Sequence, residues 1–265
     1  MSLQVCPPNL VLGRTVRPRA TRLRIPPPEP LFCRSSRGLL PIAVAASVSD
    51  LIAEDLACRR GERLIFAGLS FRVPPGGAVV LTGSNGSGKT SLLRIVAGLL
   101  APAAGRLAWG EKPVSGEVAA HRARLHYIGH RDAIKSALTP RETLSFWAAL
   151  RGFPGSRSAP AIDRALAALA LDRTADWPSR WLSAGQRRRL ALARLLAAPA
   201  PLWLLDEPMS TLDDNGRARL ERMIVEHRAD GGRLLLSTHV PFALAGAQTL
   251  MLDAFSPGCG DLGPG

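Results

Sequence analysis

One short segment combines glycines, a lysine and a hydroxyl group at a spacing suited to phosphate chemistry. It follows the pattern G-x-x-x-x-G-K-[ST] and reads Gly83, Ser84, Asn85, Gly86, Ser87, Gly88, Lys89 and Thr90, with Ser91 next. Glycines let the backbone curl with its N–H groups turned inward, where they can hydrogen-bond phosphate oxygens. The Lys89 ammonium can reach the β- and γ-phosphates, and the Thr90 hydroxyl can ligate Mg²⁺. The segment therefore predicts a site for ATP and Mg²⁺.

A second group of candidate residues follows two apolar runs near the C-terminal half of the chain. Residues 202–205 lead into Asp206 and Glu207, and residues 234–237 lead to His239. Ligand chemistry in α/β sheets lies at the carboxyl ends of strands, so Asp206 can hold Mg²⁺ through water and Glu207 can activate an attacking water. His239 can contact the γ-phosphate and hold that water in line. Each of these residues alone has a structural interpretation, and the phosphate loop upstream favours the catalytic one.

These groups need strands and helices that bring them to one edge of a sheet. Short apolar runs predict buried strands, strict alternation predicts half-buried strands, and a period of 3.6 predicts helices. Strands come first, a helical insert follows, and strands and helices then alternate, which favours an α/β core with a helical subdomain. No internal repeat is present, so we expect one nucleotide-binding unit. The expected strands are 51–58, 64–73, 78–82, 202–205 and 234–237, and the expected helices are 90–100, 140–151, 159–171 and 217–227.

The composition limits the class of protein. The formal net charge is +13, which suits nucleic acid or an anionic membrane surface, and equally a generally basic globular protein. No apolar run reaches the roughly 18 residues of a membrane span, so work at a membrane would require another subunit to do the spanning. The cysteines Cys6, Cys33, Cys58 and Cys259 form no C-x-x-C pair, which argues against a zinc site or a disulfide framework.

The first 48 residues differ in composition from the rest of the chain. They hold eight prolines and seven arginines, with Glu29 as the only acidic residue. A transit peptide would also be arginine-rich but should be amphipathic, and a secretory signal would have only a short, proline-interrupted apolar core at 39–48. We favour a disordered basic extension over both at 1–48. An ATP-binding domain is then expected at 49–255, with a helical subdomain at about 131–183, and a Gly/Pro tail at 256–265.

One further motif carries a resemblance to a known superfamily. The run Leu182-Ser183-Ala184-Gly185-Gln186 resembles the L-S-G-G-Q signature of ABC ATPases, with Ala184 in place of the first glycine. The resemblance implies a P-loop NTPase (RecA-like) core with an antiparallel β subdomain and an α-helical signature subdomain. It also implies that Ser183, Gly185 and Gln186 meet the γ-phosphate held by a second ATP-binding subunit in a head-to-tail dimer. Asp213 matches the loop that crosses this interface. Without the resemblance, Ser183 is an ordinary helix N-cap.

Two positions depart from the usual ABC pattern. His130 stands where a glutamine ordinarily senses Mg²⁺ and touches the membrane subunit, and histidine would make this contact sensitive to pH. Arg60 stands, by register from Leu69, where an aromatic residue ordinarily stacks on adenine. A guanidinium can stack on a base as well.

Several shorter motifs narrow the resemblance within the superfamily. They are Gly83-Ser84-Asn85-Gly86, Tyr127-Ile128-Gly129-His130, Ile134-Lys135, Leu138-Thr139, Glu142-Thr143-Leu144, Phe146-Trp147 and the block 182–194. Together they resemble one family, the haem-exporter ATP-binding subunits of cytochrome c maturation, called CcmA. The resemblance implies a peripheral subunit on the cytoplasmic face of the inner (plasma) membrane, bound to integral-membrane CcmB-like and CcmC-like partners and not to nucleic acid. ATP hydrolysis would serve haem delivery through release of a haem-carrying chaperone.

Two alternatives remain open from the sequence. An ATPase of another ABC transporter would share every catalytic residue and differ in the partner-facing insert at 130–181. A soluble ABC ATPase acting on ribosomes or DNA would suit the positive charge, but basic charge alone is weak evidence for nucleic acid. The spacing between Lys89 and Asp206 also leaves no room for the long coiled coil of the DNA-repair members.

Overall fold

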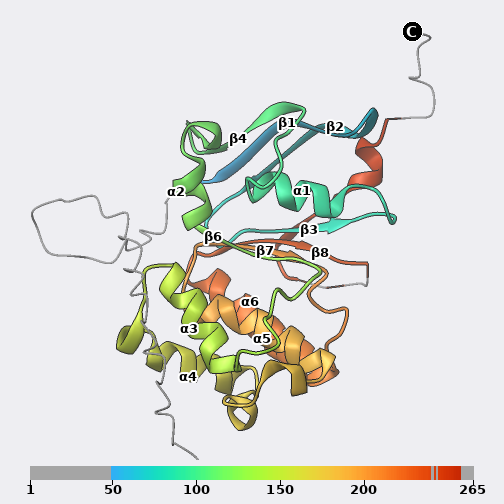
Figure 1. Ribbon diagram of the computed structural model, residues 1–265. Coiled ribbons are helices and arrows are strands. Elements are labelled where there is room, and N and C mark those ends of the chain that lie inside the picture. The colour runs from blue at the N-terminus through green and yellow to red at the C-terminus, as the bar shows by residue number, and fades with distance from the viewer. Residues whose placement is uncertain (1–48, 240–241, 243, 258–265) are drawn as a thin grey trace, which may run out of the picture. The chain divides into compact units, whose positions relative to one another are not determined.

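The structure is a computed structural model that describes residues 49–239, 242 and 244–257 (Figure 1). The predicted extension at 1–48 and most of the predicted tail at 256–265 lie outside the described residues. Their boundaries therefore stay predictions. No helix in the described part of the chain is both long and apolar enough to cross a bilayer.

Two sheets enclose the first helix, α1 (Lys89–Val96) (Figure 1). Leu92, Leu93 and Val96 of α1 belong to one buried cluster with residues of both sheets, so the helix is held from two sides. The antiparallel sheet has the order β2-β1-β4-β5, and the parallel sheet has the order β6-β7-β8-β3-β9. Their strands are β1 (Leu51–Arg60), β2 (Arg63–Val73), β4 (Ala104–Trp109) and β5 (Lys112–Pro113), and then β3 (Ala78–Thr82), β6 (Leu125–Ile128), β7 (Leu202–Asp206), β8 (Arg233–Ser237) and β9 (Ala247–Met251).

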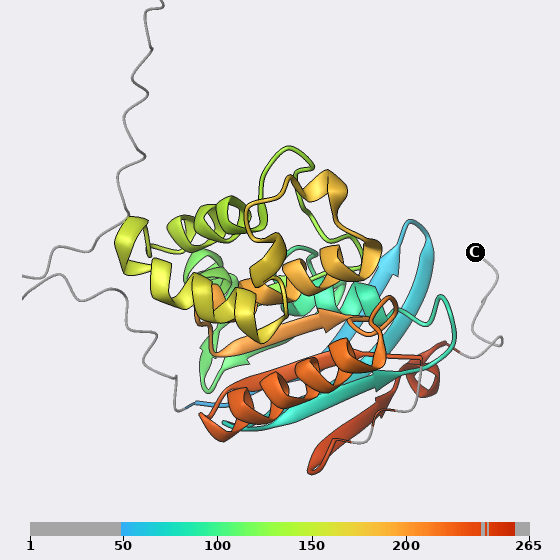
Figure 2. The same cartoon turned by 90° about the horizontal axis from the view of Figure 1, so that it is seen from below.

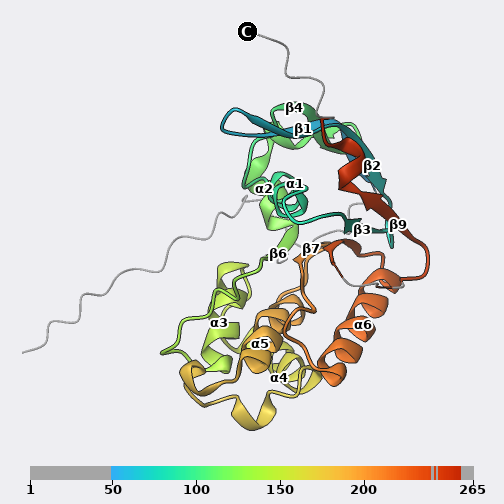
Figure 3. The same ribbon diagram turned by 90° about the vertical axis from the view of Figure 1, so that its right-hand side faces the viewer.

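The other face of the parallel sheet is covered by helices (Figures 2 and 3). Helices α5 and α6 lie closest to the sheet, and a second buried cluster joins them to α3, α4 and the strands. The bounds of the helices are α2 (Val118–Ala123), α3 (Pro140–Leu150), α4 (Ala159–Ala168), α5 (Ala184–Ala197) and α6 (Asp214–Ala229).

The expected strands and helices are confirmed, with shifted ends. Strands β7 and β8 are buried along their whole length, as apolar runs in the middle of a parallel sheet should be. The first helix ends at Val96, earlier than expected, because Gly98 adopts the left-handed conformation (φ 67°) that commonly terminates helices. Strands β4, β5, β6 and β9 and helix α2 were not predicted individually, because each is short and lacks a clear alternating or helical pattern.

Two histidines beside Trp203 are uncharged, of which His126 is buried and His227 is half-buried. His126 on β6 lies opposite Trp203 of β7, and the indole of Trp203 stacks on the ring of His227 from α6 at 3.8 Å and 5°. His126 Nε2 lies 2.6 Å from the Ala198 carbonyl oxygen, and His227 Nε2 lies 3.2 Å from that of Arg233. Burial lowers the pKa of His126 to about 3 and that of His227 to about 4. Both rings are therefore uncharged donors at neutral pH.

The two histidines should make the fold sensitive to acid. Between their lowered folded pKa values and about 6.5, only the unfolded chain binds these protons. Their stabilising contribution is therefore complete above pH 6.5 and is lost as the pH falls, at up to about 1.4 kcal/mol per pH unit for each histidine. Urea unfolding at pH 7 and pH 5 should show a loss of roughly 4 kcal/mol from this pair. His227→Phe, which can keep the ring stack, should remove about half of the loss; an unchanged pH dependence would contradict the assignment.

Candidate active site

The predicted phosphate loop joins β3 to α1, as its motif requires. Gly83 and Gly88 have φ values of 139° and 102°, and a Cβ atom at either position would lie 2.8 Å from a neighbouring side-chain atom. Both positions therefore need glycine. Lys89 Nζ donates to the carbonyl oxygens of Gly83 at 2.8 Å and Ser84 at 2.9 Å. The ammonium is thus held within the loop, next to the start of α1, where the helix dipole also favours an anion.

A hydrogen-bonded network connects this loop to the carboxyl ends of β7 and β8. Thr90 Oγ1 donates to the Asp206 carboxylate at 2.9 Å, and Ser237 Oγ donates to the same carboxylate at 2.7 Å. Asp206 and Ser237 are paired neighbours in the parallel sheet, which explains the second contact. The Asp206 side chain is buried, with only 2% of its surface exposed. The network brings together Thr90 and Asp206, the two residues predicted to serve Mg²⁺.

The chemistry of these oxygen atoms fits Mg²⁺. Thr90 supplies a hydroxyl and Asp206 a carboxylate, and Mg²⁺ prefers oxygen ligands and usually keeps waters or substrate phosphates in its coordination shell. In the described residues, no group of three or more His, Cys, Asp and Glu side chains could hold a metal ion. An ion at Thr90 and Asp206 would therefore complete its shell with phosphate oxygens and water.

Glu207 and His239 lie together at the edge of this network. His239 Nδ1 is 3.4 Å from Glu207 Oε2, and the two side chains are 53% and 25% exposed. Glu207 has a positive φ of 46°, which is uncommon for a residue other than glycine. Its N–H is held by Ser237, through the side-chain oxygen at 3.0 Å and the carbonyl oxygen at 3.2 Å. The strained backbone turns the carboxylate out of the strand, toward His239 and solvent.

Arg188 of α5 binds the backbone near Asp206 and Glu207. This role of Arg188 was not predicted from the sequence. Its side chain is 2% exposed and donates to the carbonyl oxygens of Gly129, Asp206, Glu207 and Pro208 at 2.9–3.2 Å. It also donates to Asp132 at 3.1 Å. The guanidinium thus links α5 to the ends of β6 and β7. The run of three arginines at 187–189 was the available signal, but it did not show which of them turns inward.

His130 follows Gly129 directly but is not brought to the network. The side chain is exposed, and within the described ranges no hydrogen bond or ion pair joins it to another residue. The Gly129 carbonyl nevertheless shares Arg188 with the carbonyls of Asp206 and Glu207. Arg188 therefore links the backbone beside His130 to the backbone of Asp206 and Glu207.

The signature segment forms the start of α5. Ser183 is its N-cap: the hydroxyl accepts from Gln186 N at 3.1 Å, and Ser183 N donates to Gln186 Oε1 at 2.8 Å. The expectation that Ser183 caps a helix is therefore confirmed. A Cβ atom on Gly185 would lie 3.3 Å from the Thr211 carbonyl oxygen, so the segment before Asp213 packs against this helix start. Asp213 caps α6 through Gly216 N at 2.8 Å.

The signature residues do not meet the phosphate loop of their own chain. Across the described part of the chain, no hydrogen bond joins Ser183, Gly185 or Gln186 to residues 83–91. Arg60, by contrast, lies beside that loop, because its Nε donates to Ser91 Oγ at 3.4 Å. Asp253 also contacts the loop and was not predicted: its carboxylate accepts from Ser84 N at 2.9 Å and from Ser84 Oγ at 2.6 Å.

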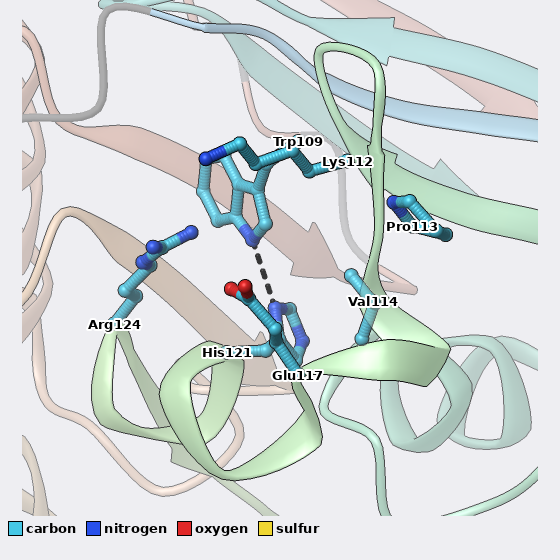
Figure 4. A pocket seen from close by; sticks show the side chains of 7 residues that line it. All are labelled: Trp109, Lys112, Pro113, Val114, Glu117, His121 and Arg124. Carbon is cyan, nitrogen blue, oxygen red and sulfur yellow. Dashed lines mark hydrogen bonds between the residues drawn. The ribbon is translucent and has the colours of Figure 1, made fainter.

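A small enclosed pocket between the antiparallel sheet and α2 has a structural role (Figure 4). Trp109 Nε1 donates to His121 Nδ1 at 2.9 Å, and His121 Nε2 lies 2.6 Å from the Val96 carbonyl oxygen. Burial lowers the pKa of His121, and a neutral ring with its proton on Nε2 satisfies both contacts. None of the predicted site residues lines this pocket. The residues around it are Trp109, Lys112, Pro113, Val114, Glu117, His121 and Arg124.

Comparisons with known proteins agree with the fold and the motifs. The family model for ABC transporters matches residues 66–210. Over 204 residues the chain is 57% identical to the cytochrome c biogenesis ATP-binding export protein CcmA of Rhodospirillum rubrum, covering 77% of this chain and 86% of that protein. This chain belongs to the CcmA family. The CcmA of Paramagnetospirillum magneticum is 52% identical over 210 residues, covering 79% of this chain and 97% of that protein.

Solved structures similar to this CcmA family member are ATP-binding subunits of ABC transporters. One from Pyrococcus furiosus has a TM-score of 0.70 at 22% identity, covering 79% of this chain and all of that one. Another ATP-binding subunit has a TM-score of 0.67 at 25% identity, covering 72% and 79%. The predicted CcmA resemblance and the predicted P-loop NTPase fold are both confirmed. Membership of the ABC ATPase class supports ATP binding and hydrolysis.

Proposed function

We propose that this chain is the ATP-hydrolysing subunit of an ABC transporter that acts in cytochrome c biogenesis by serving haem delivery. The observation that supports it best is the continuous network from the phosphate loop through Thr90 and Asp206 to Glu207 and His239. It supports the proposal because the Lys89 loop, the oxygen atoms of Thr90 and Asp206, and the Glu207 carboxylate lie side by side. These are the parts that phosphoryl transfer to water requires.

Each part has a defined task in the proposed reaction. The loop N–H groups and the Lys89 ammonium bind the β- and γ-phosphates, and Thr90 and Asp206 hold Mg²⁺, which neutralises phosphate charge when bound. The Glu207 carboxylate accepts a proton from the attacking water as the water oxygen bonds to the γ-phosphorus, and the bond from that phosphorus to the bridging oxygen breaks to release ADP. His239 contacts the γ-phosphate and helps to hold the attacking water in line. Arg60 stacks on or beside the adenine, and His130 links the site to a membrane partner.

The site is completed by a second copy of the ATP-binding subunit. Ser183 and Gly185 are exposed or partly exposed and lie away from the loop of their own chain, so the Ser183 hydroxyl and the Gly185 N–H can meet the triphosphate of a partner, while the Ser183 N–H is already bonded to Gln186. Gln186 supports them by capping Ser183, and Asp213 lies on the adjoining loop. Membrane-spanning CcmB-like and CcmC-like subunits would hold this pair on the cytoplasmic face of the membrane. In this proposal residues 49–255 form the ATP-binding domain, with no nucleic acid as partner.

A charge placed at Ser183 tests the shared site. Ser183→Asp and Ser183→Asn both keep a good N-cap for α5, but only the aspartate sets a negative charge against the partner's triphosphate. The Asp variant should lose nearly all ATP hydrolysis, while the Asn variant should keep most of it. Both should bind ATP normally as isolated chains, because each chain's own loop is unchanged. Equal hydrolysis by the two variants would show that the signature does not face ATP.

A further inference from the structure

The phosphate loop is restrained from outside by a residue that follows the edge strand. Strands β3 and β9 are parallel neighbours, and Thr82 at the end of β3 pairs with Met251 at the end of β9. The backbone continues for two residues beyond the end of each strand. This brings together Ser84 and Asp253, which are 169 positions apart in the sequence. Both oxygens of the Asp253 carboxylate accept hydrogen bonds from Ser84, one from the N–H at 2.9 Å and one from the hydroxyl at 2.6 Å.

This contact is charged and is connected to the catalytic lysine. The hydroxyl and N–H of Ser84 lower the pKa of Asp253, and the nearby Lys89 charge adds to this, so the carboxylate is ionised. The carbonyl oxygen of Ser84 accepts from Lys89 Nζ at 2.9 Å and from Ser87 N at 3.2 Å. Asp253 therefore binds the N–H and the hydroxyl of Ser84, and the carbonyl oxygen of Ser84 orients the Lys89 ammonium.

Ser84 depends on Asp253 for this restraint. In the part of the chain that the structure describes, no other side chain bonds the N–H or the hydroxyl of Ser84. The residues around it offer little stiffness, because Gly83 and Gly86 are both in conformations with positive φ. Without the carboxylate, the first half of the loop would keep only its internal hydrogen bonds.

We propose that Asp253 is a positioning residue for ATP binding: it fixes Ser84, and through the Ser84 carbonyl the Lys89 ammonium, before the nucleotide arrives. This inference rests on the proposed role of the 83–90 loop. Asp253 itself does not touch the nucleotide. Its negative charge opposes the triphosphate, but the carboxylate is solvent-exposed, so this repulsion is screened, while its two hydrogen bonds act at contact distance. Preorganisation of the loop is the larger effect.

Substitutions that separate the hydrogen bonds from the charge test the proposal. Asp253→Ala removes both, and Asp253→Asn removes the charge but keeps one acceptor. By calorimetry with ATP and Mg²⁺, the Kd should rise about tenfold in the Ala variant and about threefold in the Asn variant. Glu111→Gln is the matched control, because it removes an exposed carboxylate that makes no hydrogen bond or ion pair in the described residues. This control should bind ATP like the unaltered chain.

The position of the lysine can be read without nucleotide. The chain has three lysines, so amine labelling followed by mass spectrometry can compare Lys89 with Lys112 and Lys135 in one sample. Asp253→Ala should raise the labelling rate of Lys89 severalfold and leave the other two unchanged. Lys112 and Lys135 are already exposed, so a loss of folding is measured separately, by far-ultraviolet circular dichroism of the variant. Ser84→Ala, which removes only the hydroxyl contact, should shift Lys89 labelling and Kd in the same direction by a smaller factor, and it serves if Asp253→Ala does not fold.

Two outcomes would overturn the inference. If both Asp253 variants bind ATP as tightly as the unaltered chain or more tightly, the carboxylate acts as a repelling charge or has no role. If Lys89 labelling is unchanged in Asp253→Ala and Ser84→Ala, the lysine is not positioned through Ser84. Failure of the proposed function would look different, since Lys89→Ala would then keep normal ATP binding whatever the Asp253 variants do.

Discussion

Replacing Lys89 by Ala should abolish ATP hydrolysis and weaken ATP binding about tenfold or more, because a charged hydrogen bond contributes roughly 1.5–3 kcal/mol. The ammonium is held by the Gly83 and Ser84 carbonyls at the start of α1, and no second lysine lies in the loop. Calorimetry and phosphate release with Mg-ATP measure the two effects. Lys112→Ala is the matched control, since Lys112 lies exposed on β5 and should change neither quantity. Normal turnover by Lys89→Ala would contradict the assignment of the loop.

Replacing Glu207 by Gln should leave ATP binding intact and lower the rate of hydrolysis by about 10²–10⁴, the usual contribution of a positioned general base. The amide keeps the size of the side chain, the backbone N–H of residue 207 stays bonded to Ser237, and the proposed Mg²⁺ ligands Thr90 and Asp206 are untouched. ATP should then accumulate between two subunits. Light scattering with Mg-ATP should show a doubled mass for the variant.

Two results would contradict this account of Glu207. Hydrolysis within a few fold of the unaltered chain would mean that another group activates the water. A variant that binds ATP but stays a single subunit, even with membrane partners present, would count against the shared site. Glu226→Gln on the exposed face of α6 is a control for the loss of one carboxylate and should behave like the unaltered chain.

The sequence predicted those parts of the site whose signals are local. The phosphate loop is recognisable because its glycines, lysine and threonine serve one cradle within eight residues. Asp206 and Glu207 are recognisable because a buried strand ends at Asp206. The Ser183 cap is local as well, since it involves a residue three positions away. In each case the physical requirement lies within one turn or one strand end.

The residues that sequence reasoning missed act over long distances. Arg188 contacts carbonyls that lie between 18 and 59 positions away, and Asp253 contacts Ser84 across 169 positions. These contacts depend on the order of strands in the parallel sheet, which places β6 beside β7 and β9 beside β3. Arg188 lies in a basic run and Asp253 lies near the end of the chain. The sequence around neither residue has a pattern that predicts such a long-range contact. The edge strand β9 was itself unpredicted, because most of its residues are polar or exposed.

The central claim, that ATP hydrolysis by this chain drives haem delivery to c-type cytochromes, is tested most directly in a cell whose only copy carries Glu207→Gln. This variant keeps the fold, the nucleotide and the surfaces for membrane partners. A haem stain of membrane proteins, run beside a spectrum of b-type haem, reports both classes of cytochrome. We predict that mature c-type cytochromes are missing while b-type cytochromes, which need no covalent attachment, are present. Normal levels of c-type cytochromes would contradict the claim and favour a transporter of another substrate, and loss of both haem types would place the defect before delivery.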